Sequence, residues 1–382
     1  MAVFLCLYSI LIVAIDVQVF PSVLTRLGGN SVQQGLLLSS LFFLFPLSSA
    51  FAGLTADKTG KKTVLSAGAA FLTIPFGISA IVKDLWIRTL AVLLFGIGMG
   101  AVEGQSTALL ADLYPGKERS ILNLSQVFFC IGAAGGPFLI SLAYRLHPGL
   151  KLPHLLWSVT IITSTVMIGF FLLNDKTSTS ASLNPSGFKN VLQDREGRLL
   201  LLSIFLYVAP EMGTAGWLAK YTEEYLFLSK ASAPLSLTLF WGGLGVSRAL
   251  VGFLFHSIKD IQLLSAAFLL TFIFQISAFT VKTPAAALVF FFFIGFGMGT
   301  VWPTLVAMIS MRFKQSSGSA VGLAVAVGAT AIPIIHQVIG ILSRESLFGL
   351  QYTLLGLGLL TLFNLYIIYT LYCIQNQAEL KI

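Results

Sequence analysis

The sequence is short of charge and of cysteine. Only 10% of its 382 residues are Asp, Glu, Lys or Arg, whereas soluble domains carry about 25% charged residues on their surfaces. Hydrophobic residues make up 56% of the chain, which indicates a surface that faces lipid. The three cysteines, Cys6, Cys130 and Cys373, lie inside apolar runs without CxxC or metal-ligand spacing. We therefore expect neither a disulfide framework nor a zinc site.

The basic residues are few but they are in excess, giving a formal net charge of +8. They lie in short loops between long apolar runs, a distribution that indicates membrane topology and not nucleic-acid binding. Fourteen of the 23 Lys and Arg residues fall on one side of the predicted membrane and nine on the other. This bias predicts a multi-pass protein of the cytoplasmic (inner) membrane with both termini in the cytoplasm.

The apolar runs predict twelve membrane helices. A spanning helix needs about 20 apolar residues, and suitable runs occupy 2–26, 33–54, 63–82, 86–112, 119–145, 153–174, 198–227, 232–255, 261–281, 284–311, 316–343 and 348–374. The first run has no basic region before it and no cleavage site after it, so we expect a helix and not a signal peptide. Residues 175–197 are polar, and we predict a cytoplasmic linker between a bundle at 1–174 and a bundle at 198–382.

An internal repeat supports these two halves. FGIGMGAVEG at 95–104 aligns without a gap with IGFGMGTVWP at 294–303, and GAAGGP at 132–137 aligns with GATAIP at 328–333. The glycines of the first pair lie inside predicted helices with no strand before them, so they indicate close helix packing and not a dinucleotide site. The predicted fold is all-α, with twelve transmembrane helices in two pseudo-symmetric six-helix bundles and a substrate site between the halves near the midplane.

The loop after the second helix carries a motif. Residues 53–62 read GLTADKTGKK and resemble the major facilitator signature G-x-x-x-D-(R/K)-x-G-(R/K)-(R/K), with every defining position occupied. The resemblance implies the major facilitator fold, and it implies that this loop is a cytoplasmic gate. The residues to which it assigns that role are Gly53, Asp57, Lys58, Gly60, Lys61 and Lys62. Gly53 would allow close helix approach, and Asp57 could cap a helix or pair with a cation.

The second half keeps only a remnant of this motif, the G-x-x-R of Gly245 and Arg248. Arg248 is a gate-pairing candidate, and a snorkelling, positive-inside role is an equal alternative.

Three acids lie at membrane depth, where a carboxylate costs a few kcal/mol and marks a pathway or a proton site. Asp16, Glu103 and Glu211 are therefore proton-coupling candidates. The alternative for each is a structural carboxyl that is bonded to neighbouring helices. Sodium could replace the proton at the same carboxylates, and no other cofactor is expected.

Asp16 in helix 1 and Glu103 in helix 4, together with residues 98–137 and 207–221, resemble the fucose-permease branch of the superfamily. That resemblance implies sugar:proton symport through these two acids. The sequence departs from the branch just after Glu103, because Ser106 and Thr107 stand where the branch has an asparagine.

Polar and aromatic side chains in the apolar runs are candidates for binding the substrate, because amides and indoles suit sugar hydroxyls and C–H faces. They are Gln18, Gln105, Gln126, Tyr207, Trp217, Trp241, Gln275, Trp302, His336 and Gln337, with Asn123 as a further polar residue. The alternative for each is interhelical bonding or, for the tryptophans, an interfacial belt.

The predicted function is alternating-access transport of a small polar solute, a sugar in the first instance, coupled to protons. GAAGGP at 132–137 partly resembles the antiporter motif of drug exporters, so a proton-coupled exporter of drugs or amphiphiles is the alternative. No clustered His or Ser-His-Asp arrangement supports an enzyme. The expected partners are the solute and the lipid bilayer, with no nucleic acid, and we expect a monomer.

Overall fold

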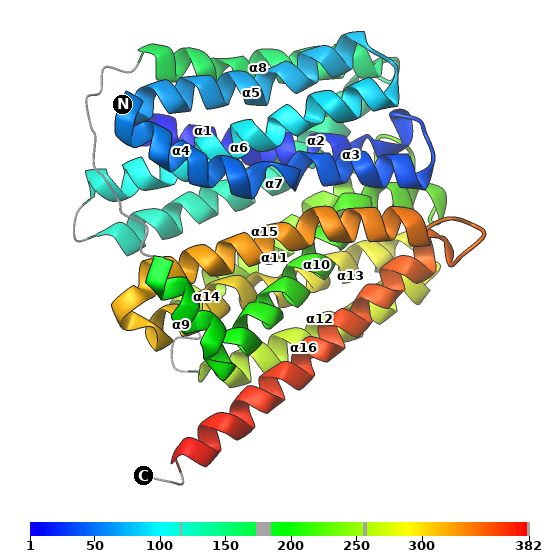
Figure 1. The fold of residues 1–382 in the computed structure, drawn as a ribbon. Coiled ribbons are helices and arrows are strands. Elements are labelled where there is room, and N and C mark those ends of the chain that lie inside the picture. The colour runs from blue at the N-terminus through cyan, green and yellow to red at the C-terminus, as the bar shows by residue number, and fades with distance from the viewer. Residues whose placement is uncertain (115–116, 173–184, 255–257, 380–382) are drawn as a thin grey trace. The chain divides into compact units, whose positions relative to one another are not determined.

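The computed structural model describes residues 1–382 except 115–116, 173–184, 255–257 and 380–382, and within these ranges it is helical without strands (Figure 1). The helices are α1 (Ala2–Val17), α2 (Val19–Ser22), α3 (Ser31–Phe43), α4 (Phe45–Thr59), α5 (Lys61–Ile81), α6 (Leu85–Leu113), α7 (Glu118–Leu146), α8 (Leu152–Leu172), α9 (Pro185–Gln193), α10 (Arg195–Glu224), α11 (Leu235–Leu254), α12 (Asp260–Thr280), α13 (Pro284–Gly299), α14 (Val301–Arg312), α15 (Ser317–Leu342) and α16 (Gly349–Glu379). Short 3-10 turns cover Leu24–Arg26 and Lys314–Ser316.

These helices confirm the predicted all-α membrane fold. Within the described ranges, 11 helical spans are long and apolar enough to cross a membrane. The predicted run 232–255 is not among them. It corresponds to α11, a helix of 20 residues that borders the undescribed residues 255–257.

Three of the predicted spans are broken inside the membrane, between α1 and α2, between α3 and α4, and between α13 and α14. Each break is followed by a proline within the first three residues of the next helix: Pro21, Pro46 and Pro303. Proline has no N–H for the carbonyl four residues earlier, so each break leaves a carbonyl oxygen without its helical partner. The apolar pattern runs through these breaks, and for that reason it predicted continuous helices.

The polar stretch 175–197 contains a helix that the sequence did not predict. Helix α9 ends two residues before α10 begins at Arg195, so α10 also starts earlier than the predicted 198. The side chain of Val191 in α9 is fully buried, and a Cβ at Gly197 would lie 2.6 Å from the Val191 carbonyl oxygen. This close packing on the first turn of α10 accounts for a helix in an otherwise polar segment.

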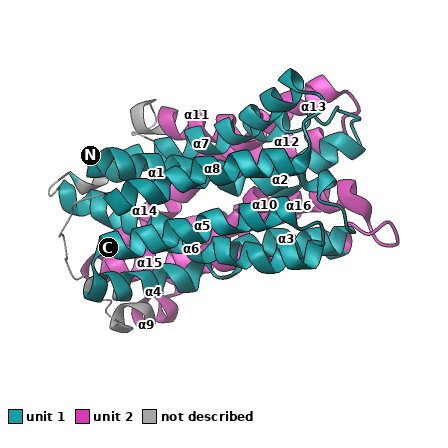
Figure 2. Ribbon diagram, turned by 90° about the horizontal axis from the view of Figure 1, so that it is seen from above, with its two compact units in different colours: residues 1–181, 216–238, 336–341 teal, residues 182–215, 239–335, 342–382 magenta. Residues whose placement is uncertain are grey.

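The chain forms two compact units, coloured separately in Figure 2. Unit 1 comprises 1–181, 216–238 and 336–341, and unit 2 comprises 182–215, 239–335 and 342–382. The division runs through α10 and α15, whose segments 216–224 and 336–341 pack with unit 1. The bundle boundaries at 174 and 198 stay a prediction.

In unit 1 the glycine-rich helix α6 packs closely on its neighbours. A Cβ at Gly96 or Gly100 would lie 3.1 or 2.7 Å from backbone oxygens of α3 and α4. A Cβ at Gly98, on the opposite side of α6, would lie 2.5 Å from a backbone nitrogen of α5.

Unit 2 repeats this pattern on α13. A Cβ at Gly295 or Gly299 would lie 1.9 or 2.4 Å from backbone oxygens of α11, and one at Gly297 would lie 3.1 Å from a backbone oxygen of α12. The aligned glycines therefore make equivalent contacts in both units, which confirms that they serve helix packing.

Candidate transport site

Asp16 lies at the end of α1 and is buried, with 1% of its surface exposed. The Thr163 hydroxyl of α8 lies 3.0 and 2.9 Å from its two carboxyl oxygens. The single hydroxyl proton is shared between the two oxygens, so the bond to each is weaker than a full hydrogen bond. The contact joins two helices of unit 1, and both interpretations of Asp16, as proton site and as structural carboxyl, stay open.

Glu103 of α6 has fewer polar contacts. Its Oε2 atom is buried and finds no hydrogen-bond partner among the described residues. The structural alternative required a carboxyl bonded to neighbouring helices, and no such bond is described for this oxygen. Because an ionised oxygen without a partner is costly in such a place, the carboxyl is suited to hold a proton in this conformation.

Glu211 belongs to a polar cluster in unit 2, which we call the Arg248 cluster and which consists of Tyr207, Glu211, Arg248 and the carbonyls of Met298 and Gly299. The Tyr207 hydroxyl donates to Glu211 Oε1 at 2.7 Å and also lies 3.2 Å from the Met298 oxygen. Arg248 Nε donates to the Gly299 oxygen at 3.3 Å. The Arg248 charge lies within electrostatic range of Glu211.

This cluster explains the break between α13 and α14. Pro303 has no N–H to give to the Gly299 carbonyl four residues earlier, and Arg248 supplies a donor instead. The cation also lies at the C-terminal, partly negative end of α13. Arg248 thus donates to a carbonyl at a helix break and lies within electrostatic range of an acid, and both expected roles, gate pairing and snorkelling, stay predictions.

The signature loop at 53–62 is only partly described. Lys61 is buried and forms an ion pair with Asp112 of α6, while Lys58 is exposed and Lys62 lies 5.8 Å from the Phe171 ring centre. Gly60 separates α4 from α5 with φ of 87°, a value that favours glycine. The side chain of Asp57 lies outside the described residues.

The expected close packing at Gly53 is not found. The nearest described atom to a Cβ there would be Gln105 Nε2, at 3.9 Å, which is an ordinary contact. The expectation was wrong for this conformation because no described backbone approaches that face of α4.

The substrate-binding candidates are divided between the two units. Gln18, Gln105, Trp217 and His336 are buried in unit 1, where Gln337 is half-buried and Gln126 is exposed; in unit 2, Tyr207, Trp241 and Gln275 are buried and Trp302 is half-buried. Asn123 has no described side chain. A common substrate site for these residues therefore stays a prediction.

Two of the candidates make structural contacts. Gln275 donates to the Leu354 carbonyl at 3.0 Å and to the Thr214 hydroxyl at 3.3 Å, which matches the interhelical alternative. The His336 ring stacks on Phe42 at 6.2 Å and lies against Gly216, where a Cβ would be 2.3 Å from Cε1. The Nδ1 atom of this ring is buried and has no hydrogen-bond partner among the described residues, so both interpretations of His336 stay open.

A set of contacts at the predicted outer ends of the unit 1 helices was not predicted from the sequence. Lys220 of α10 is buried and donates to Gln34 Oε1 of α3 at 2.6 Å, with Glu224 at 3.7 Å. A Cβ at Gly340 of α15 would lie 2.7 Å from the Ser31 carbonyl oxygen of α3. We call this set of α3, α10 and α15 contacts the outer closure.

Further contacts extend the outer closure. The Thr25 hydroxyl donates to Glu223 Oε2 at 2.8 Å, and Arg26 lies 3.5 Å from the ring centre of Tyr144. Thr25 and Glu223 are separated by 198 residues, and no local sequence pattern indicates a contact over such a distance.

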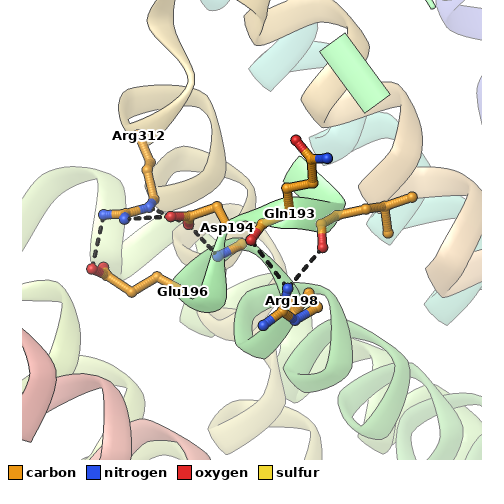
Figure 3. A network of polar contacts seen from close by, with 7 residues as sticks. Gln193, Asp194, Glu196, Arg198 and Arg312 are labelled. Carbon is orange, nitrogen blue, oxygen red and sulfur yellow. Dashed lines mark hydrogen bonds and ion pairs between the residues drawn. The ribbon is translucent and has the colours of Figure 1, made fainter. Parts of the chain in front are cut away.

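An ion-pair network joins α10 and α14 at their predicted cytoplasmic ends (Figure 3). Arg312 contacts Asp194 through Nε at 2.6 Å and Nη2 at 2.8 Å, and contacts Glu196 through Nη1 at 2.9 Å. Asp194 Oδ1 also accepts from the Gly197 backbone N–H at 2.7 Å, which makes it the N-cap of α10. The hydrogen bond from Arg312 holds the pKa of Asp194 below its ordinary value.

Replacing Asp194 by alanine should destabilise the protein by about 1 kcal/mol, the typical loss of an N-cap, with a further loss from the ion pair. Because the pKa of Asp194 is lowered by folding, its stabilisation is present above about pH 4 and disappears as the pH falls through the lowered pKa. Thermal unfolding in detergent from pH 3 to 7 measures this, with Asp194→Asn removing the charge.

Asp84 is the matched control, because it caps α6 through the Ile87 N–H at 3.0 Å and has no ion pair among the described contacts. Asp84→Ala should lose only the cap, about 1 kcal/mol. Equal losses for Asp194→Ala and Asp84→Ala would contradict the role of Arg312.

Comparisons with known proteins agree with this architecture. The uncharacterised MFS-type transporter YfkL of Bacillus subtilis is 20% identical over 303 residues, which cover 78% of this chain and 76% of YfkL. The quinolone resistance protein NorA of Staphylococcus aureus is 25% identical over 139 residues, 35% of this chain and 36% of NorA. The crystal structure of the nucleoside transporter NupG superposes with a TM-score of 0.81 at 12% identity, covering 97% of this chain and 99% of NupG.

One family accounts for these similarities and for three features described above: the glycine repeat, the membrane spans and the signature loop at 53–62. The sequence profile of the Major Facilitator Superfamily matches residues 2–336. The chain belongs to the Major Facilitator Superfamily and is a multi-pass membrane transporter, not an enzyme.

Proposed function

We propose that this transporter moves a small polar solute, a sugar in the first instance, by alternating access driven by protons. We place it in the cytoplasmic membrane as a monomer, with both termini in the cytoplasm. The observation that carries the proposal is Glu103 of α6, whose Oε2 atom is buried and has no partner among the described residues. Such a group can be neutral in one conformation and ionise when its surroundings change.

The outer closure supports alternating access. It joins the predicted outer ends of α3, α10 and α15 through one buried lysine and a close backbone contact. Contacts of this kind can separate and re-form as two halves rock. In the other conformation these ends would part and expose the path to the outside.

The test is uptake of labelled monosaccharides into proteoliposomes under an inward proton gradient. Glu103→Gln and Asp16→Asn should each lower gradient-driven uptake at least tenfold, because neither amide can release a proton. Glu345→Gln removes an exposed acid and should leave uptake unchanged. Sodium gradients are tested in parallel, since sodium could bind the same carboxylates.

If no sugar is taken up in any gradient, while a hydrophobic drug is expelled, the importer is refuted and the exporter takes its place. Two observations favour that second candidate. The partial match to NorA is one. The other is the packing of GAAGGP on α1, where a Cβ at Gly132 would lie 2.3 Å from the Leu11 oxygen and one at Gly136 would lie 3.1 Å from the Ile15 Cα atom.

A further inference from the structure

Helices α12 and α16 of unit 2 are joined at their predicted outer end. Gln351 Nε2 of α16 donates to the Phe279 carbonyl of α12 at 2.7 Å. One turn further along α16, the Leu354 carbonyl accepts from Gln275 Nε2 at 3.0 Å. A Cβ at Gly358 would still lie 3.5 Å from an α12 side chain. The last turns of α16 lie apart from the other helices of unit 2 (Figure 1), so the two helices form a wedge.

An open groove of about 800 Å³ lies between the two helices where they part. Ile261, Gln262 and Ser265 line it from α12, and five residues between Leu362 and Tyr372 line it from α16. Small-molecule sites in proteins have volumes of about 300–1,000 Å³. The wedge is therefore large enough to hold a molecule and not only a side chain.

The length of this groove matches one leaflet of a bilayer. Leu362 and Tyr372 are ten residues apart, which is about 15 Å along a helix. The hydrocarbon core of a bilayer is about 30 Å thick, so one leaflet accounts for about 15 Å. Helix α12 begins at this end, directly after the exposed Lys259, a charged residue that belongs at the membrane surface. The groove thus runs from the predicted cytoplasmic surface to about the middle of the bilayer.

The lining of the groove changes in polarity along α16. Leu362 and Leu365 make its deep part apolar. Tyr366, Tyr369 and Tyr372 follow toward the surface, with 62%, 63% and 48% of their surfaces exposed, so their rings are open to an occupant. Tyrosine suits a membrane–water interface, because its ring lies in the apolar region while its hydroxyl reaches the headgroups. The groove therefore has the apolar and polar ends of a lipid molecule.

The surface end of the groove also carries donors for a phosphate. Gln262 is exposed, and its amide has two donor hydrogens. Lys259 is the N-cap of α12 and Gln262 is the third residue of the helix, positions whose side chains can meet. Asp260 lies between them and is half-buried, so it offsets the charge of Lys259. We therefore expect neutral donors to recognise the phosphate, without a strong preference for a headgroup of negative net charge.

We propose that the wedge between α12 and α16 binds one phospholipid of the cytoplasmic leaflet, with an acyl chain against Leu362 and Leu365 and the phosphate beside Gln262 and Tyr372. The competing occupant is a second copy of the chain. A stable protein interface uses about 20–30 residues a side, whereas eight described residues line this groove, which favours the lipid. The inference depends neither on the transported solute nor on proton coupling.

The first experiment locates the lipid by photo-cross-linking. The full chain is reconstituted with a phosphatidylcholine that carries a diazirine near the end of one acyl chain, and cross-linked peptides are identified by mass spectrometry. Labelling of Leu362 and Leu365 should exceed that of the exposed face of α8, represented by Ile161, at least fivefold. Equal labelling of all exposed helices would show surrounding lipid only and would overturn the site.

The second experiment counts the phospholipids that stay bound after detergent washing, by native mass spectrometry. Leu365→Trp fills the groove and should lower the retained lipid at least fivefold. Leu359→Trp is the matched control, because Leu359 is exposed on the same helix, does not line the groove and should tolerate the larger side chain. Equal retention by the two variants would overturn the site.

Gln262→Leu keeps the inference testable if Leu365→Trp does not fold. The change removes the amide at an exposed position, and retention should fall about tenfold because a hydrogen bond to a charged phosphate is lost. Phosphatidylglycerol and phosphatidylcholine should be retained equally well, and a tenfold preference for either would overturn recognition by neutral donors. Cross-links between two copies of the chain through Tyr369 would identify a second copy as the occupant and overturn the lipid site.

Discussion

Replacing Gly340 by alanine should hold the transporter open at its outer end and reduce transport at least tenfold. The new Cβ would lie 2.7 Å from the Ser31 carbonyl oxygen and 3.1 Å from the Gly35 Cα atom, both backbone atoms that no rotamer change can move. The helices α3 and α15 must separate, and overpacking of this kind costs about 1–3 kcal/mol. In an equilibrium between two conformations, about 1.4 kcal/mol shifts the populations tenfold.

The measurement uses a protein whose three cysteines are replaced by serine and in which Ala219, a buried residue of α10 one position before Lys220, becomes cysteine. An impermeant maleimide added outside should label this cysteine faster when Gly340 is alanine. Gly135→Ala is the control, because no described atom lies within 4 Å of a Cβ there. Unchanged labelling with full transport would show that the outer closure is not a gate.

Replacing Gly295 by alanine should prevent stable folding of the second half. The Cβ would lie 1.9 Å from the Phe240 carbonyl oxygen and 2.8 Å from its carbon, closer than any relaxed contact. Helix α13 would have to move away from α11 and take the Arg248 cluster with it, so we expect a loss of several kcal/mol. Thermal unfolding and yield of the purified protein measure this loss.

Gly242→Ala provides the matched control on the partner helix α11, since nothing lies within 4 Å of a Cβ at that position. It should be neutral or slightly stabilising, because alanine favours the helix by about 1 kcal/mol over glycine. Equal stability of the two variants would contradict the close packing of α11 and α13.

The sequence predicted the helices well because apolar length alone decides membrane insertion. The run at 86–112 corresponds to α6 at Leu85–Leu113, for example. The breaks at Pro21, Pro46 and Pro303 were not predicted, since hydropathy is insensitive to a missing N–H. Helix α9 was missed because its stability comes from the burial of Val191 and not from its polar composition.

The candidate site was less predictable. The three acids could be located because a carboxylate is costly at membrane depth. In the structure Asp16 and Glu211 are buried and Glu103 is half-buried. Their partners could not be predicted, because Thr163 lies 147 residues from Asp16 and is one of many threonines in apolar runs. The role of Arg248 depends on a carbonyl that Pro303 leaves free, and no spacing rule connects those two residues.

The glycine contacts of α6 and α13 have a consequence for mutational robustness. In both units the atoms that meet these glycines are largely backbone atoms, contributed by Leu41 and Phe45 in one half and by Phe240 and Leu244 in the other. Every amino acid supplies the same carbonyl, so substitution on the neighbouring helix leaves the contact intact. After a gene duplication, the two halves could therefore diverge almost freely around these glycines while the helix spacing that they set was inherited unchanged.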